Sequence, residues 1–148
     1  MSWNESETLE MSRVATLEYL LLGDLRDLLE ETPSDTTTYH WLVAVLDALL
    51  DTLPREFGLE EADGYLNEVL QSYPSWYRKV AHLQAEHQSL YGELRQLRRE
   101  LQLLRRPGAS GRRVRQALHR WMNRLIDHHR REQELVLSAM NLEVGAGD

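Results

Sequence analysis

Apolar residues recur at spacings of three and four along most of the chain, and three stretches rich in Pro, Gly, Ser and Thr interrupt this pattern. The period is that of a helix with one buried face. The interruptions, at 31–38, 71–75 and 105–113, supply capping and breaking residues of the kind found between helices. The pattern therefore predicts helices over approximately 6–31, 38–71, 74–105 and 111–141, and no strands.

Short connections make consecutive helices antiparallel. The expected architecture is therefore an all-α fold, an up-down-up-down antiparallel four-helix bundle that forms one domain over residues 1–148. A chain of this length can bury a substantial core. Pro54 lies within the second predicted helix, where it either kinks the helix or starts a new one.

Polar residues occupy several positions where the helical period expects apolar ones. In the third helix the stripe from Val80 to Leu104 contains His87. In the fourth helix, which has its stripe between Leu118 and Ala139, His128 and Glu132 take consecutive core positions one turn apart.

The second helix continues the stripe Leu42–Leu53 with Glu56 and Glu60, where Glu61 competes with Glu60 for the inward position. The first helix places Glu18 at a core position, and Asp24 lies on an alternative stripe.

Counting from turns centred near residues 35, 73 and 109 gives the level of each polar position in the bundle. Glu60, His87, His128 and Glu132 fall in one layer, and Glu56 lies one turn away. By the same count Glu18 is one to two turns out and Asp24 is further. Of the other histidines, His82 and His119 lie off the stripes and are expected in solvent, His129 faces a neighbour or solvent, and His40 marks a helix start.

A buried carboxylate without a partner costs several kcal/mol or takes up a proton, and no Lys or Arg points inward at this level. A metal ion would supply the missing positive charge. The chain has no cysteine, so its ligands would be imidazole and carboxylate, which suit iron, manganese or zinc. The alternative is a metal-free polar layer, in which protonated His87 and His128 pair with the glutamates and fix the register of the helices.

The net charge of −7 is unevenly distributed. Residues 1–75 carry 16 Asp and Glu against 3 Lys and Arg, whereas residues 76–148 carry 8 against 14. This favours an acidic helix pair packed beside a basic pair over a nucleic-acid-binding face. The start of the chain has no basic-then-apolar signal pattern, and no apolar run is long enough for a membrane span. We therefore expect a cytoplasmic protein without nucleic-acid or membrane partners.

Three segments resemble the hemerythrin-like (HHE cation-binding) domain family. The stretch "DHHRREQELVLSAMN" is similar to the closing helix of that family, with a histidine followed four residues later by a glutamate. "LPREFGLEEADGYL" resembles its second helix, and "HLQAEHQSLYGEL" its third. The resemblance extends over nearly the whole chain as a pattern, and the last stretch is the most specific.

The resemblance implies a non-haem, usually di-iron, centre inside a four-helix bundle that binds or senses oxygen or iron. Carried over, His128 and Glu132 match the fourth-helix pair, His87 the third-helix ligand and Glu60 the second-helix glutamate. Glu56 stands where the family has histidine. For the first-helix histidine the chain offers only Glu18, Tyr19 or Asp24.

The predicted metal ligands are thus Glu56, Glu60, His87, His128 and Glu132, and the predicted ion is iron, with manganese or zinc as alternatives. Dioxygen or a small oxygen species is the expected exogenous partner. The competing hypothesis is a metal-free bundle that serves as an interaction or scaffold module through its basic 105–115 turn or its acidic helix pair. An enzyme is less favoured because no phosphate loop or nucleophile motif is found, and the pattern specifies no oligomeric state.

Overall fold

The computed structural model describes residues 5–31, 36–61, 65–104 and 109–147, and all of them are helical except Glu31, Tyr73 and Leu104. No strand occurs in these ranges, so the predicted all-α class is confirmed. The elements are α1 (Glu5–Glu30), α2 (Thr36–Glu61), α3 (Tyr65–Ser72), the short 3₁₀ helix η1 (Pro74–Trp76), α4 (Tyr77–Leu103) and α5 (Ala109–Gly147).

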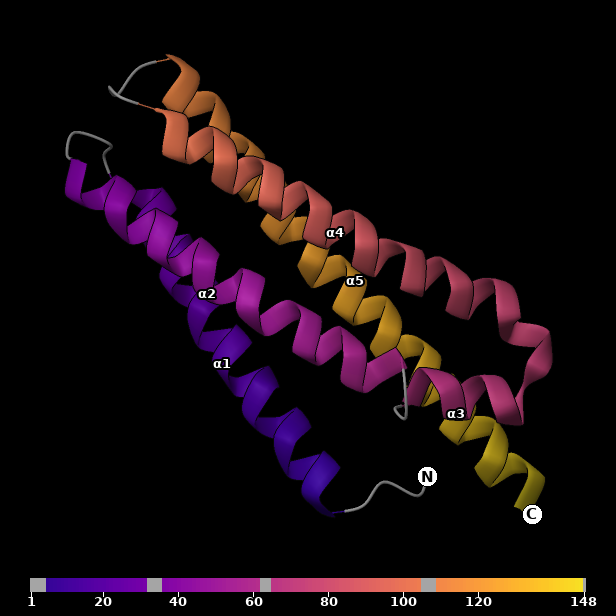
Figure 1. The fold of residues 1–148 in the computed structure, drawn as a ribbon. Coiled ribbons are helices and arrows are strands. Elements are labelled where there is room, and N and C mark those ends of the chain that lie inside the picture. The colour runs from indigo at the N-terminus through magenta and orange to yellow at the C-terminus, as the bar shows by residue number, and fades with distance from the viewer. Residues whose placement is uncertain (1–4, 32–35, 62–64, 105–108, 148) are drawn as a thin grey trace.

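The long helices lie side by side as a helical bundle (Figure 1). α1 ends and α2 begins at the same end of the bundle at which α4 ends and α5 begins. α2 contacts both α1 and α4, and α4 also packs on α5, whereas α1 touches α5 at only a few positions. The α1/α5 side is therefore the most open seam of the bundle.

The second predicted helix, 38–71, is wrong as a single element. α2 ends at Glu61 and the separate helix α3 begins at Tyr65, with 62–64 outside the described residues. The break coincides with a slip in the apolar stripe, because Phe57 is buried near the end of α2 while Leu66 and Val69 are buried from α3. A single straight helix would place Phe57 and Leu66 on different faces, so it could not bury both sets of side chains.

Two other expectations about the helices differ from the structure. Pro54 lies inside α2, so the interpretation that it starts a new helix is wrong. The last helix continues to Gly147, beyond the predicted end at 141.

The buried apolar residues form two clusters, one on each side of a polar layer. The larger cluster contains the buried leucines of α1 and α2, with Val45 and Phe57, together with Leu90–Leu101 of α4 and Val114–Leu125 of α5. The smaller cluster joins α3, α4 and α5, and it comprises Leu66, Val69, Val80, Leu83, Leu135 and Ala139. Because His87 and His128 lie in sequence between the two sets, the polar layer is enclosed by hydrocarbon along the bundle axis.

Polar contacts fasten the acidic pair α1/α2 to the basic pair α4/α5. Arg98 of α4 donates to Asp47 of α2 at 2.7 Å. Arg115 of α5 is buried, and its guanidinium donates to the carbonyl of Leu29 at 2.6 Å and to that of Glu31 at the end of α1. This agrees with the expectation that two oppositely charged helix pairs pack together.

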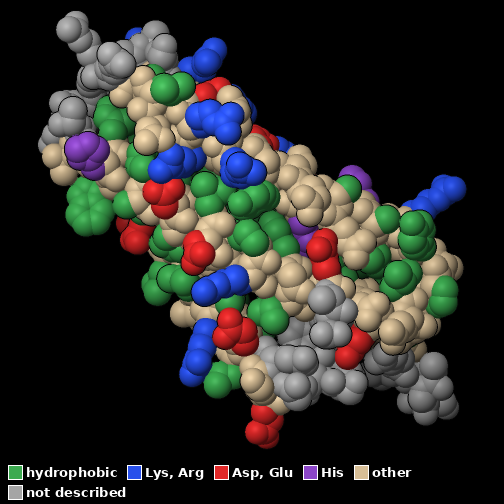
Figure 2. Space-filling view, in the orientation of Figure 1, with side chains coloured by type: hydrophobic (Ala, Val, Ile, Leu, Met, Phe, Trp, Pro, Cys, Tyr) green, Lys and Arg blue, Asp and Glu red, His purple; other side chains and the backbone are tan. Residues whose placement is uncertain are grey.

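The surface is mixed. Hydrophobic side chains reach solvent between charged ones on the face drawn in Figure 2, in keeping with the sizeable exposed fractions of Leu17, Trp41 and Ile126. Within the residues that the structure describes, no helix has both the length and the apolar character that a membrane crossing requires.

Candidate metal centre

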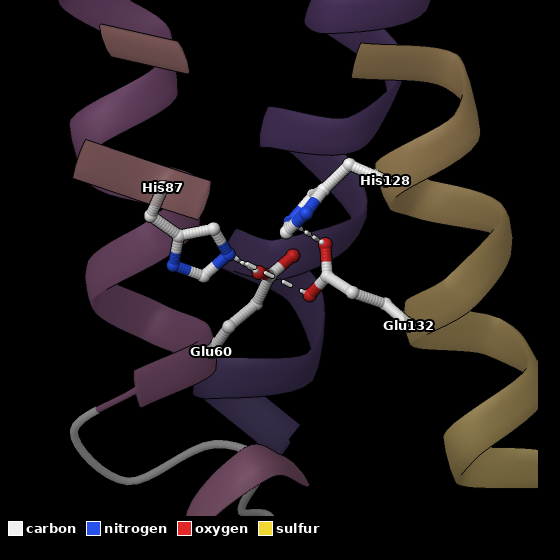
Figure 3. A group of neighbouring side chains, drawn as sticks. All are labelled: Glu60, His87, His128 and Glu132. Carbon is white, nitrogen blue, oxygen red and sulfur yellow. Dashed lines mark ion pairs between the residues drawn. The ribbon is translucent and has the colours of Figure 1, made fainter. Parts of the chain in front are cut away.

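Four of the five predicted side chains meet in the polar layer. Glu60 comes from α2, His87 from α4, and His128 and Glu132 from α5, and all four are at least 97% buried. Their side chains point toward one another (Figure 3). One donor atom from each lies within 4.8 Å of the others. We call these four residues the inner group.

The imidazole Nε2 atoms of the inner group face its carboxylates. His87 Nε2 lies 3.1 Å from Glu60 Oε2 and 3.8 Å from Glu132 Oε2. His128 Nε2 lies 2.7 Å from Glu132 Oε1. Neither Nε2 atom makes an aligned hydrogen bond, so the two nitrogens and the carboxylate oxygens converge on a common space instead of pairing with regular geometry.

The other nitrogen of each histidine contacts a second carboxylate outside the inner group. His87 Nδ1 lies 2.9 Å from Glu61 Oε1, and His128 Nδ1 lies 3.3 Å from Glu86 Oε1. Histidines that bind metals commonly donate their second ring N–H to a carboxylate, which fixes the tautomer and the ring orientation. With Nδ1 occupied in this way, Nε2 of each histidine could bind an ion.

Packing also fixes the ring of His87. Phe57 stacks on it with ring centroids 3.9 Å apart and planes inclined by 5°, and His128 meets it edge-on at 4.8 Å. Glu86 is held in turn by Arg131, which donates to Glu86 Oε2 at 2.6 Å. The supporting contacts thus extend from the buried layer to the surface.

A second group of side chains lies beside the first. Glu18 of α1, Glu56 of α2 and His129 of α5 also bring donor atoms within 4.8 Å of one another, and we call them the outer group. His129 Nε2 lies 2.5 Å from Glu18 Oε1 and 3.3 Å from Glu56 Oε1. Its Nδ1 lies 3.3 Å from Glu132 Oε1, so Glu132 is the carboxylate between the two groups.

One sequence-based expectation is corrected here and another is made more specific. The sequence predicts that His129 faces a neighbour or solvent, and its 28% exposed side chain does face neighbouring helices, where it contacts Glu18 and Glu56 in addition to Glu132 of its own helix. The sequence places Glu18 one to two turns out, yet it joins Glu56. One turn is about 5.4 Å, and long glutamate and histidine side chains that lean toward each other close such a difference in level. A glutamate within the leucine stripe of the first helix is the signal in the sequence for Glu18.

The structure also shows the burial and contacts of the other polar residues considered in the sequence. Glu56 is buried as predicted but belongs to the outer group, and Glu61 supports His87 from a half-buried position. His82 is 66% exposed and lies 3.7 Å from Glu86. Asp24 and His40 are exposed, and His119 is half-buried.

Burial and mutual contact shift the pKa values of both groups strongly. Burial lowers the pKa of His87, but contacts with Glu132 and Glu60 outweigh it and raise the value to about 10. His129 behaves in the same way, with a pKa of about 11 owing to Glu132 and Glu18. Burial raises the pKa of Glu60 to about 8.

The carboxyls of Glu56 and Glu132 are shifted in opposite directions. Burial, followed by contact with Glu18, raises the pKa of Glu56 to about 10. Burial also acts to raise the pKa of Glu132, but contacts with His128, His129 and His87 hold it well below its usual range. Without an ion, the site therefore retains protons that a metal would displace.

The inner group fits a metal ion in donor type and in spacing. Two atoms bound to one ion at about 2.1 Å can be at most about 4.2 Å apart, so donor atoms within 4.8 Å need only small side-chain movements. Nitrogen and oxygen donors of this kind suit iron, manganese or zinc. The described Glu and His residues can thus hold a metal ion, and the role of each as a ligand stays a prediction.

An open groove leads to the carboxylates along the loosely packed α1/α5 seam. It has a volume of about 770 Å³. Glu18, Glu56, Glu60, His129 and Glu132 line its floor, and His87 and His128 do not line it. The outer group is therefore accessible from the surface, whereas the two inner histidines lie behind it.

Comparison of the chain with protein-family models, with curated proteins and with solved structures finds no match.

Proposed function

We propose that this chain is a metal-binding protein with a carboxylate-rich, hemerythrin-like centre, in which the inner group holds non-haem iron and the outer group offers a second position. The helices would follow the up-down-up-down order of hemerythrin-like bundles. The proposed role is the binding or sensing of oxygen species or of iron.

The orientation of the two inner histidines is the observation that carries this proposal. Each directs Nε2 toward Glu60 or Glu132 while Nδ1 contacts a separate carboxylate, Glu61 or Glu86. In a metal-free layer the same two carboxylates would accept from the two N–H groups of a protonated imidazole, whereas in a metal-bound layer Nε2 would carry the ion and only Nδ1 would donate. Carboxylates that contact the second ring nitrogen in this way orient metal-binding imidazoles and raise their basicity.

Both groups together contribute side chains from α1, α2, α4 and α5. Bound iron would supply a redox-active Lewis acid. The protein would supply four carboxylates that balance the charge of the ions, apolar clusters that exclude water on two sides, and the groove as the route for an exogenous ligand.

Metal content per chain tests the proposal. Tag-free protein loaded anaerobically with iron(II) and freed of excess metal should carry about two ions, the number typical of carboxylate-bridged bundle sites. His128→Ala should lose at least one of them, and Glu132→Gln, which keeps the side-chain volume, should also lose metal. His40→Ala is the matched control, since His40 is exposed and far from the site in sequence. A wild-type chain that remains metal-free after loading would refute the proposal.

A second candidate function is a metal-free bundle that serves as an interaction module. The observation that favours it is the set of close imidazole–carboxylate pairs, such as His129 with Glu18 at 2.5 Å and His128 with Glu132 at 2.7 Å, which can balance charge without an ion. Treatment with a chelator separates the two functions. The melting temperature of protein purified from iron-supplied cells should fall on chelation if metal is bound, and it should not change if the layer is self-sufficient.

A further inference from the structure

The groove along the α1/α5 seam has two kinds of surface. We call the outer group with Glu60 and Glu132 its floor. The other lining residues, which we call its walls, are mostly apolar; they are Met11, Ala15, Leu22, Val136 and Leu137, together with Tyr19 and Gln133. Along α1, Glu18 lies between Ala15 and Leu22, so apolar side chains border the carboxylates of the floor.

The groove is much larger than a small oxygen species requires. Its volume of about 770 Å³ falls in the range of about 300–1,000 Å³ that is typical of sites for organic ligands. Apolar walls gain free energy by contact with hydrocarbon, roughly 25 cal/mol for each Å² removed from water. The dimensions and the walls therefore favour a molecule with an extended apolar part.

The floor favours a Lewis base at the other end of that molecule. An ion on the outer group would have three protein ligands, or four with Glu132, whereas iron and manganese commonly take up to six. A further ligand could reach such an ion from the groove, because Glu18, Glu56 and His129 line it. Glu18 Oε2 and Glu56 Oε1 are buried and make no aligned hydrogen bond, although Glu56 Oε1 lies 3.3 Å from His129 Nε2. Both residues line the groove, so both oxygens could bind an ion there.

We propose that the α1/α5 groove binds an amphipathic monocarboxylate of the medium-chain alkanoate class, with its carboxylate on the ion held by the outer group and its hydrocarbon chain against the apolar walls. This inference depends on the proposed metal-binding function. Two divalent ions would balance the four glutamates Glu18, Glu56, Glu60 and Glu132, so the loaded floor would not attract an organic cation, and each trivalent ion would add attraction for an anion.

Titration calorimetry on cobalt(II)-loaded protein tests the proposal, with the visible absorption of cobalt as a second readout that reports ligation. Metal content is measured first. Decanoate, hexanoate and butanoate are titrated, with decylammonium as the charge-reversed control. Affinity should rise by about twofold for each added methylene in a groove open on one side, and the cobalt spectrum should change on saturation.

Filling the groove locates the site. Ala15 is exposed on α1 and lines the groove, so Ala15→Trp should fold and should weaken decanoate binding by at least about tenfold. Ala44→Trp is the matched control, because Ala44 is an alanine on α2 that does not line this groove. Butanoate, which has little tail, should lose less affinity than decanoate in the Ala15 variant.

Several results would overturn the proposal. If decanoate binds no more tightly than butanoate, the hydrocarbon chain does not contact the apolar walls. If decanoate binds metal-free protein equally well, or leaves the cobalt spectrum unchanged, its carboxylate does not bind the ion. If the two tryptophan variants weaken binding equally, the ligand does not lie in the α1/α5 groove. If decylammonium binds more tightly than decanoate, the site does not select an anionic head group. If the protein takes up metal yet fails these tests, only this inference falls. A failure to take up any metal would overturn the proposed function as well.

Discussion

Glu86 should control the metal affinity of His128 without binding the ion itself. It lies on α4, 3.3 Å from His128 Nδ1, and its other oxygen accepts from Arg131 at 2.6 Å. Glu86→Gln keeps the size of the side chain but removes the charge that orients the ring and stabilises its Nδ1–H tautomer. The expected result is weaker metal binding in a chain that still folds.

The size of the effect follows from the geometry. Loss of a partner of this kind typically weakens metal binding by about 10–100-fold, which corresponds to about 1.4–2.7 kcal/mol. The contact of 3.3 Å is at the long end of the hydrogen-bond range, and the Glu86 side chain is 17% exposed. We therefore expect a loss near tenfold for Glu86→Gln, and a larger one for Glu61→Gln, which removes the shorter 2.9 Å contact to His87.

Competition with a chromophoric chelator measures this affinity directly. Glu93→Gln is the matched control, since Glu93 is also a glutamate of α4 paired with an arginine of α5, Arg124, but contacts no histidine in the described residues. Its affinity should equal that of the wild type. If Glu86→Gln binds metal within about twofold of the Glu93 variant, a range well below the usual effect of losing such a partner, the orientation argument for the centre is refuted.

Two further predictions concern stability. Folding raises the pKa of His87 to about 10 and that of His129 to about 11, from 6.5. It raises the pKa of Glu56 to about 10 and that of Glu60 to about 8, from 4.5. Between the lower and the raised pKa of each group, the folded metal-free chain therefore binds more protons than the unfolded chain. Stability should then fall as pH rises from 7 toward 10, which thermal melts in chelator will show. A flat profile would contradict the raised values. Metal-loaded protein should lose less, because ions replace those protons. Arg115→Ala removes buried donors to the last carbonyls of α1 and should cost about 1–3 kcal/mol in chemical denaturation. Arg113→Ala, at an exposed position, should change stability by less than about 0.5 kcal/mol, and equal effects would exclude the capping role.

The helical period carries most of the information about the inner group. A residue that replaces leucine in a stripe with spacings of three and four must point inward, so the sequence alone assigns His87, His128 and Glu132 to the core, and also Glu60, with Glu61 as its competitor. Counting from the turns then assigns them to one level, because antiparallel helices rise at the same rate. The structure brings these four side chains together.

The outer group is harder to predict because it depends on distances between helices. His129 follows a core position directly, and a stripe assigns such a residue to the flank. It reaches Glu18 only because α1 stands away from α5 and leaves space between them. The groove has the same origin, since no sequence period encodes the spacing of two helices that hardly touch. The division of the second helix is visible in the sequence only as a change of phase near residue 60.

The sparse packing of α1 on α5 has a consequence for protein lifetime. α1 is joined to α5 chiefly through Glu18 with His129 and through Arg115 at its end. An ion on the outer group would add coordinate bonds between α1, α2 and α5. A chain deprived of metal should then expose α1 most often through local opening, and proteases act on such opened states. The amount of this protein in a cell would follow its metal supply by selective degradation of the empty form, with no change in synthesis.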